Sequence, residues 1–154
     1  MVSDAKIVHD TIHASQLVNV PISEIWDAYE DTSRRAIWGV PDGDSIIYEE
    51  SRFYEGGQDR YRCGPADSLR YCVQLEYVKI VRGELIVYTE TVRDGGCTLS
   101  SSLVTWDFTQ REGGIAVSIT CQVVSFIGRE MIDGNRNGHE TTLEQLVSYL
   151  GEGT

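Results

Sequence analysis

A long apolar segment is the first thing that this sequence lacks. Its 154 residues contain no run of about eighteen apolar side chains, the length that a transmembrane helix needs. Charged residues and a histidine also interrupt the N-terminal stretch MVSDAKIVHDTIH, which therefore has no apolar centre like that of a signal peptide. We expect no membrane insertion and a cytoplasmic location.

Cysteine and histidine are scarce, and they are not arranged as metal ligands. The chain has four cysteines, with no Cys-x-x-Cys pair and no histidine at ligand spacing from a cysteine. They are Cys63, Cys72, Cys97 and Cys121. This scatter predicts free thiols in a reducing compartment and no metal site.

Motifs of the common catalytic and cofactor sites are missing as well. The sequence has no P-loop, no Gly-x-Ser-x-Gly elbow and no dinucleotide-binding glycine pattern that opens a helix. We expect no organic cofactor, and no catalytic residue is assigned from a motif.

Basic residues are few. Thirteen Lys and Arg stand against 24 Asp and Glu, which gives a net charge of −11. The basic residues form no cluster beyond Arg34-Arg35 and Arg60 with Arg62. Such a chain repels phosphate groups, so we expect neither nucleic acid nor an anionic membrane surface as a partner.

What is present fits an ordinary folded unit. The hydrophobic content of 41% in a chain of this length is enough to bury a core without disulfides. No internal repeat, linker or low-complexity tract divides the sequence. We expect one domain over residues 1–154.

The most regular stretch is Tyr71–Thr91, which predicts a β-hairpin with its turn at Arg82-Gly83. Further strands are predicted in the order Thr11–Val20, Ser45–Tyr54, Gln58–Cys63, Leu99–Gln110 and Ile115–Val124, with Gly56-Gly57 as a tight hairpin in which both glycines accept positive φ. After Pro21 we expect a short helix with Ser23 as N-cap, and then a second one over Asp31–Gly39.

The C-terminal region predicts one long helix. Leu143, Leu146, Val147 and Leu150 form a single apolar stripe, which indicates a helix over His139–Leu150. The segment 134–138, with a glycine at each end, is expected to be a flexible connection before it.

This order of elements is that of a helix-grip fold, and local sequence agrees with it. The chain resembles the SRPBCC superfamily (START-like, Bet v 1-like), within it the branch named after activators of the 90-kDa heat-shock-protein ATPase. The residues that carry the resemblance are Val20-Pro21 leading to Ile25-Trp26, Trp38 before Pro41, Gly56-Gly57, Gly64-Pro65-Ala66-Asp67, Ile80–Glu90, Gly113-Gly114 and Leu143-Glu144-Gln145-Leu146. Tyr54, Arg82-Gly83 and His139 depart from the family pattern of Arg, Pro-Pro and Trp.

The resemblance implies an α+β fold. It consists of a curved antiparallel sheet of about seven strands, two short helices after the first strand, and a long C-terminal helix across the sheet. A sheet curved around a helix leaves an apolar space that suits a small molecule. The candidate ligand-binding residues are Trp38, Tyr61, Tyr71, Tyr88, Trp106, His139 and Leu143.

Each candidate also has a plainer interpretation. Aromatic residues usually pack in the core, although their N–H and O–H groups need partners there. His139, at the start of the predicted helix, is either near the cavity mouth or an ordinary exposed histidine. Glu50 and Glu90 are acid–base candidates only if strand parity turns them inward; solvated glutamates are the commoner outcome.

Three functions follow. The first is binding of a small hydrophobic or amphipathic molecule in the cavity, by a protein that is a monomer or homodimer and not an enzyme. The second is a cyclase or dehydratase in which His139 or Glu90 transfers protons. The third is a co-chaperone-like interaction module, which predicts a filled interior and an exposed apolar patch.

Overall fold

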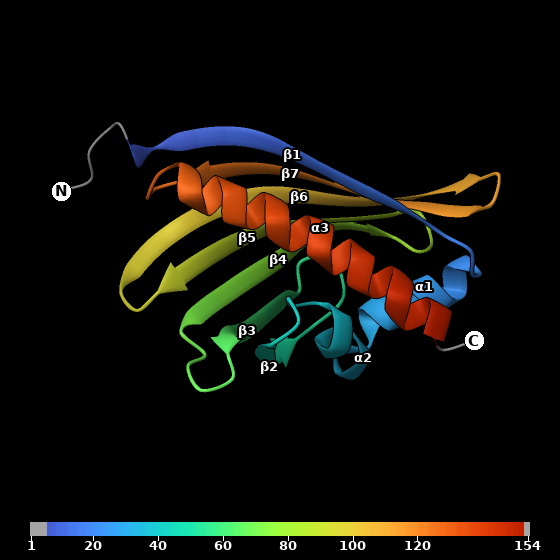
Figure 1. Cartoon of the computed structure of the whole chain (residues 1–154), viewed down its shortest axis with the longest axis horizontal. Coiled ribbons are helices and arrows are strands. Elements are labelled where there is room, and N and C mark those ends of the chain that lie inside the picture. Colours follow the sequence, from blue (N-terminus) through green and yellow to red (C-terminus); the bar gives the residue numbers. More distant parts are fainter. Residues whose placement is uncertain (1–5, 153–154) are drawn as a thin grey trace.

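One curved antiparallel sheet of seven strands dominates the computed structural model, which describes residues 6–152 (Figure 1). Its order is β1-β7-β6-β5-β4-β3-β2, so every strand from β2 to β7 neighbours the next in sequence and β1 pairs with β7. The strands are β1 Val8–Val18, β2 Asp44–Ser51, β3 Gln58–Pro65, β4 Tyr71–Val81, β5 Leu85–Asp94, β6 Cys97–Arg111 and β7 Gly114–Ser125. The predicted helix-grip sheet is confirmed.

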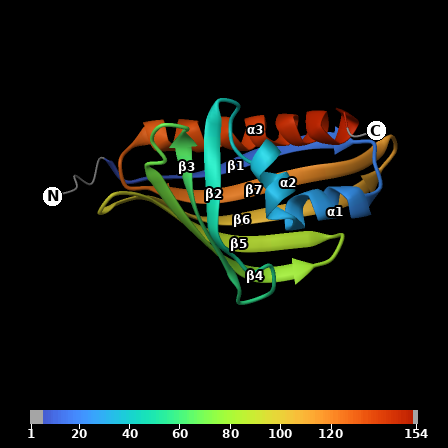
Figure 2. The same ribbon diagram turned by 90° about the horizontal axis from the view of Figure 1, so that it is seen from below.

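Three helices lie with the sheet: α1 Ile22–Glu30, α2 Thr32–Trp38 and α3 Arg129–Glu152. The long helix α3 crosses the sheet, and α1 and α2 lie near its C-terminal end (Figure 1). Seen from below, β2 and β3 run across the direction of β6 and β7, which shows how strongly the sheet curls (Figure 2). The curl creates the space between the sheet and α3.

The ends of the short helices depend on local polar groups. Pro21 occupies the N-cap position of α1, and no side chain caps that helix, so the prediction of Ser23 as N-cap is wrong. Ser23 lies inside the first turn because Pro21, which lacks an N–H, is well suited to the helix start. Asp31 caps α2 by accepting a hydrogen bond from Ser33 N at 2.9 Å.

Helix α3 begins at Arg129 and runs through segment 134–138, so the expected flexible connection is wrong. The two glycines cost helix propensity, but tertiary contacts outweigh that cost. Ile132 is fully buried in the core, and Arg129 Nη1 lies 2.7 Å from Asp10 Oδ2 on β1. These contacts hold the first turns of α3 against the sheet.

The strand limits that differ most from expectation are those of β1 and β2. β1 starts at Val8, because its ladder with β7 already begins at the Val8–Ser125 pair, and it stops at Val18, where that ladder ends. β2 ends at Ser51, and only Gly56 of the Gly56-Gly57 pair takes a positive φ, of 87°. The connection is therefore a longer loop than the predicted tight hairpin.

The core forms where the inner face of the sheet meets the helices. Alternate residues of β6, Val104, Trp106 and Phe108, are buried, as period-two patterning requires. From α3, Leu143 and Leu146 pack against this face. These leucines fill the space between the sheet and the second half of α3. The space between the sheet and the first half of α3 is less filled.

Candidate ligand pocket

A pocket of about 510 Å³ lies between the inner face of the sheet and the first half of α3. Its walls come from the end of α1, from α2 and the loop after it, from strands β2 to β6, and from α3 between Glu130 and Thr142 with Ile127 just before it. The α3 residues in contact with it recur at helical spacing, for example Met131, Gly138 and Thr142. The pocket is thus formed by elements far apart in sequence.

Six of the seven candidate residues line this pocket: Trp38, Tyr61, Tyr71, Tyr88, Trp106 and His139. Leu143 does not line it. Its side chain is 1% exposed and packs in the core, because one step along the helix from Thr142 rotates the side chain towards the sheet. Leu143 is thus a core residue beside the pocket, and ligand binding by any of the seven residues stays a prediction.

The indole N–H groups of two pocket tryptophans form hydrogen bonds within the protein. Trp106 Nε1 donates to Tyr88 Oη at 3.1 Å, and Trp38 Nε1 donates to the Ala28 carbonyl at 3.2 Å. These bonds hold both indole rings in place without a ligand. The aromatic wall is consequently preformed.

Gln145 of α3 fixes the loop that closes one side of the pocket. Its Nε2 donates to the carbonyl oxygens of Trp38 at 2.9 Å and Val40 at 2.6 Å, and its Oε1 accepts from Asp42 N at 2.9 Å. Val40 and Pro41, which line the pocket, are thereby held against the helix. Sequence reasoning had not identified this role for Gln145.

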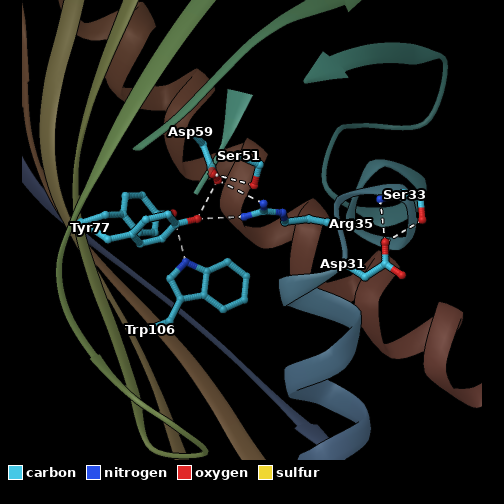
Figure 3. Close-up of polar contacts among 8 residues, drawn as sticks. Asp31, Ser33, Arg35, Ser51, Asp59, Tyr77 and Trp106 are labelled. Carbon is cyan, nitrogen blue, oxygen red and sulfur yellow. Dashed lines mark hydrogen bonds and ion pairs between the residues drawn. The ribbon is translucent and has the colours of Figure 1, made fainter. Parts of the chain in front are cut away.

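A buried ion pair joins Arg35 of α2 to Asp59 of β3 (Figure 3), and Arg35 also lines the pocket. Arg35 Nη2 lies 3.0 Å from Asp59 Oδ2, and the two residues are 6% and 0% exposed. Tyr77 Oη donates to Asp59 Oδ2 at 2.6 Å and accepts from Arg35 Nη1 at 3.2 Å, while Ser51 Oγ donates to Asp59 Oδ1 at 2.8 Å. The cluster joins α2 to β2, β3 and β4.

The guanidinium of Arg35 is enclosed as well as paired. Its central carbon lies 4.5 Å from the ring centroid of Tyr29 and 5.0 Å from that of Tyr48. Nε has no hydrogen-bond partner among residues 6–152, and Nη2 meets Asp59 at ion-pair distance without hydrogen-bond alignment; both atoms are buried. Arg35 thus borders the pocket but offers little charge to it.

Asp59 was missed by sequence reasoning, although strand parity carried the signal. Asp59, Tyr61 and Cys63 are every second residue of β3 and therefore lie on the same face of the sheet. The prediction that Tyr61 faces the interior thus implies that Asp59 does so too. The basic pair Arg34-Arg35 was read only as local charge. Arg34 Nε in fact donates to Tyr149 Oη at 2.8 Å, and Arg35 enters the core.

Glu90 is the acidic side chain that faces the pocket from β5. It shares the inner face with Tyr88 and Val92, and it lies opposite Leu75 on β4 and Ser102 on β6. It makes no side-chain hydrogen bond or ion pair within the described part of the chain. Burial raises the pKa of Glu90 to about 7.

Glu50 has the opposite environment. Its carboxylate lies 3.0 Å from Arg52 Nε and 3.1 Å from Arg60 Nε, both on exposed side chains, and it does not line the pocket. Of the two glutamates considered as acid–base candidates, only Glu90 reaches the interior.

His139 reaches the pocket from α3. Its Nε2 is buried and has no hydrogen-bond partner in residues 6–152. Burial lowers the pKa of His139 to about 4, so the ring is neutral at pH 7. The pocket therefore combines aromatic walls with the Glu90 carboxyl and a neutral imidazole, neither of which the fold pairs within residues 6–152, and Glu130 adds a second carboxyl to its lining.

Residues 6–152 contain no group of three or more His, Cys, Asp or Glu side chains that could hold a metal ion. Within the same range, none of the helices has both the length and the apolarity to cross a membrane.

Solved structures share the fold at low sequence identity. An uncharacterized protein from Rhizobium leguminosarum is 24% identical, with a TM-score of 0.83 over 96% of this chain and 97% of its own. The Mll3558 protein from Rhizobium loti is 23% identical, with a TM-score of 0.81 over 94% of this chain and 99% of its own. DynU16, described as a protein in the dynemicin biosynthetic locus, is 17% identical, with a TM-score of 0.70 over 94% of this chain and 48% of its own.

These likenesses establish the architecture and nothing about ligands. No curated protein matches the sequence. The model of the family described as activator of Hsp90 ATPase homolog 1-like protein matches residues 19–151, which include α1, α2, β2 to β7 and nearly all of α3. The chain is therefore a member of the activator of Hsp90 ATPase homolog 1-like family and has the helix-grip fold of the SRPBCC superfamily.

Proposed function

We propose that this protein binds a small amphipathic molecule in the pocket between the sheet and α3. The observation that carries the proposal is a pocket of about 510 Å³ with mainly aromatic and aliphatic walls and two polar groups, Glu90 and His139, that the fold leaves unpaired. Small-molecule sites usually occupy about 300–1,000 Å³ and combine apolar walls with a few polar groups.

The rigidity of the walls supports the same proposal. Trp38 and Trp106 are held by hydrogen bonds to the protein, and Gln145 ties down the loop at the pocket edge. A preformed site loses less conformational entropy when a ligand binds.

Native mass spectrometry of the protein purified gently from its own host tests the proposal most directly. We expect a bound small molecule that remains on the folded chain and dissociates on unfolding. Consistent absence of any adduct would count against a carrier.

A substitution that fills the pocket provides an independent test. Gly138 lies on the side of α3 that lines the pocket, and a Cβ at this position meets no atom within 4 Å. Gly138→Leu is expected to abolish binding while the helix gains stability, since glycine is about 1 kcal/mol worse than alanine inside a helix. Gly138→Ala is the matched control, because it shares the helix effect and adds one methyl group. Equal retention of ligand by the two variants would place the ligand elsewhere.

A second candidate is an enzyme of the cyclase or dehydratase type in the same pocket. It is favoured by the pKa of Glu90, which burial raises to about 7, a value suited to proton transfer at neutral pH. Once a ligand is identified, its incubation in D₂O with wild type and Glu90→Gln tests the proposal. If the protein is an enzyme, wild type alone should convert the ligand or incorporate deuterium into it. A ligand that wild type leaves unchanged would favour the carrier function instead.

The interaction-module hypothesis predicts a filled interior, and a pocket of about 510 Å³ does not meet that expectation. We also propose a cytoplasmic setting and a monomer or homodimer. The thiols of Cys63, Cys72, Cys97 and Cys121 are free, as in proteins of a reducing compartment.

A further inference from the structure

Resting on the proposed pocket function, we propose that the bound molecule is an amphipathic amine whose protonated nitrogen is held by the Glu90 carboxylate. The apolar part of such a molecule would occupy the aromatic walls. The inference concerns the chemical class of the ligand, and four features of the pocket lead to it.

The first feature is the isolation of Glu90. A carboxyl group inside a protein is normally paired, because an unpaired buried charge is costly. Glu90 has no cation of the chain beside it in the part that the structure describes, and burial alone shifts its pKa. An ammonium group would supply the missing partner through a charge-assisted hydrogen bond.

The second feature is the state of the other charged groups at the pocket. The charge of Arg35 is already compensated by Asp59 at 3.0 Å, and Tyr29 and Tyr48 enclose the guanidinium, although its buried Nε has no hydrogen-bond partner in residues 6–152. His139 is neutral at pH 7. The remaining charged group among the described lining residues is Glu130, which is also acidic. Among the described lining residues, an anionic ligand head would meet no cation whose charge is uncompensated.

The third feature is the ring surface near the carboxyl. Tyr61 and Tyr88 lie within electrostatic reach of Glu90, and both line the pocket. Aromatic faces attract an ammonium group when it is desolvated. A pocket that holds a carboxylate together with tyrosine rings therefore favours a cation over a neutral alcohol.

The fourth feature is the field of the whole chain. A net charge of −11 raises the local concentration of cations and lowers that of anions. This effect is weak at physiological salt, but it acts in the same direction as Glu90.

The inference has a measurable proton linkage. At pH 7 the free carboxyl is about half protonated, and an ammonium partner requires the ionised form, so binding releases up to about half a proton. Tyr61, Cys63, Tyr88 and Cys121, which face Glu90, stay protonated because burial raises the pKa of each. His139 stays neutral at this pH because burial lowers its pKa to about 4, and Glu130 is the other acidic residue in the pocket lining.

Three probes of matched shape test the inference: 2-(2-naphthyl)ethylamine, 2-(2-naphthyl)ethanol and 2-naphthylacetate. Their affinities for wild type and Glu90→Gln are measured by calorimetry at pH 7, in phosphate and in Tris buffer. For wild type we expect the amine to bind roughly tenfold or more tightly than the alcohol, with the carboxylate weakest. Observed enthalpies that differ between the buffers would report the proton release.

Glu90→Gln keeps the shape of the side chain and should remove the preference for the amine, while the alcohol is little affected. Glu76→Gln is the matched control, because it removes one negative charge from the exposed face of neighbouring β4, outside the pocket, and should leave the preference in place. Gly138→Leu should lose all three probes.

The outcomes separate the two proposals. Equal binding of amine and alcohol by wild type, or an amine preference that survives Glu90→Gln, overturns the amine inference and leaves the pocket function standing. Failure of wild type to bind any of the three probes overturns both. The wild-type comparison decides the matter even if Glu90→Gln does not fold.

Discussion

Glu90 and His139 face the same pocket, and burial acts on them in opposite directions. The pKa of His139 falls from an ordinary 6.5 to about 4, so between these values the unfolded chain binds more protons and folding stability is lost as the pH falls. The pKa of Glu90 rises from 4.5 to about 7, so the folded chain binds more protons in that range and stability is lost as the pH rises. The two residues therefore partly cancel near pH 5–6.

Removing the charge of Glu90 measures how much this residue contributes to the pH dependence of folding stability. Glu90→Gln should raise the free energy of unfolding relative to wild type at pH 8 by roughly 2–3 kcal/mol, with little or no gain at pH 4.5. Urea unfolding at a series of pH values measures the difference. Glu76→Gln, on the exposed face of neighbouring β4, is the control and should show no such trend. Parallel pH profiles for wild type and Glu90→Gln would mean that the carboxyl is solvated.

Trp106 tests whether a pocket residue is also part of the core. Its side chain is 4% exposed and contacts Tyr29 and Trp38 at ring-centroid distances of 5.2 and 6.1 Å. Trp106→Ala should lower the free energy of unfolding by about 3–5 kcal/mol in urea. Ile37→Ala, at a side chain that is 65% exposed, should be nearly neutral. A near-neutral Trp106→Ala would place the ring outside the packed interior.

At the scale of elements, the Arg35–Asp59–Tyr77 cluster fixes α2 against the curled end of the sheet. Helix α2 is only seven residues long and is not stable alone. Its position, which sets one wall of the pocket, depends on this ion pair and on Trp38. Breaking a buried pair leaves one charge uncompensated, so it costs more than the pair itself contributes.

A double-mutant cycle tests that account. Arg35→Met alone should destabilise by about 3–5 kcal/mol, and Arg35→Met with Asp59→Leu should recover part of this loss. The exposed pair Arg82–Asp27, at 3.5 Å, is the control, and Arg82→Met should cost about 1 kcal/mol or less. Additive losses at Arg35 and Asp59, measured by urea unfolding, would show that the two charges do not depend on each other.

At the scale of the whole molecule, we propose that the chain is one folding unit, since the sheet and all three helices share one core. Trp26 in α1, Trp38 in α2 and Trp106 in β6 belong to that core. Tryptophan fluorescence and far-ultraviolet circular dichroism should therefore report the same midpoint in one urea transition. Two separated midpoints would mean that the helices or an edge of the sheet unfold independently.

Local patterning was sufficient for most of the architecture. Alternating residues in Tyr71–Thr91 indicated β4 and β5, and Gly83 takes the positive φ of 78° that its turn requires. The same alternation placed Tyr88 and Trp106 on the inner face, and it applies equally to Glu90. The apolar stripe of α3 was also visible, because period and spacing are properties of the chain itself.

Only the tertiary structure decided the rest. From helix propensity alone, α3 would begin only after Gly138. Burial of Ile132 and the Arg129–Asp10 contact instead extend its N-terminal end to Arg129. The pairing of Arg35 with Asp59, and the turn of Leu143 into the core beside the pocket, likewise depend on how distant elements pack. Whether a buried group is paired or free is set by neighbours far away in sequence, and this is why Arg35 is enclosed and Glu90 is open to the pocket.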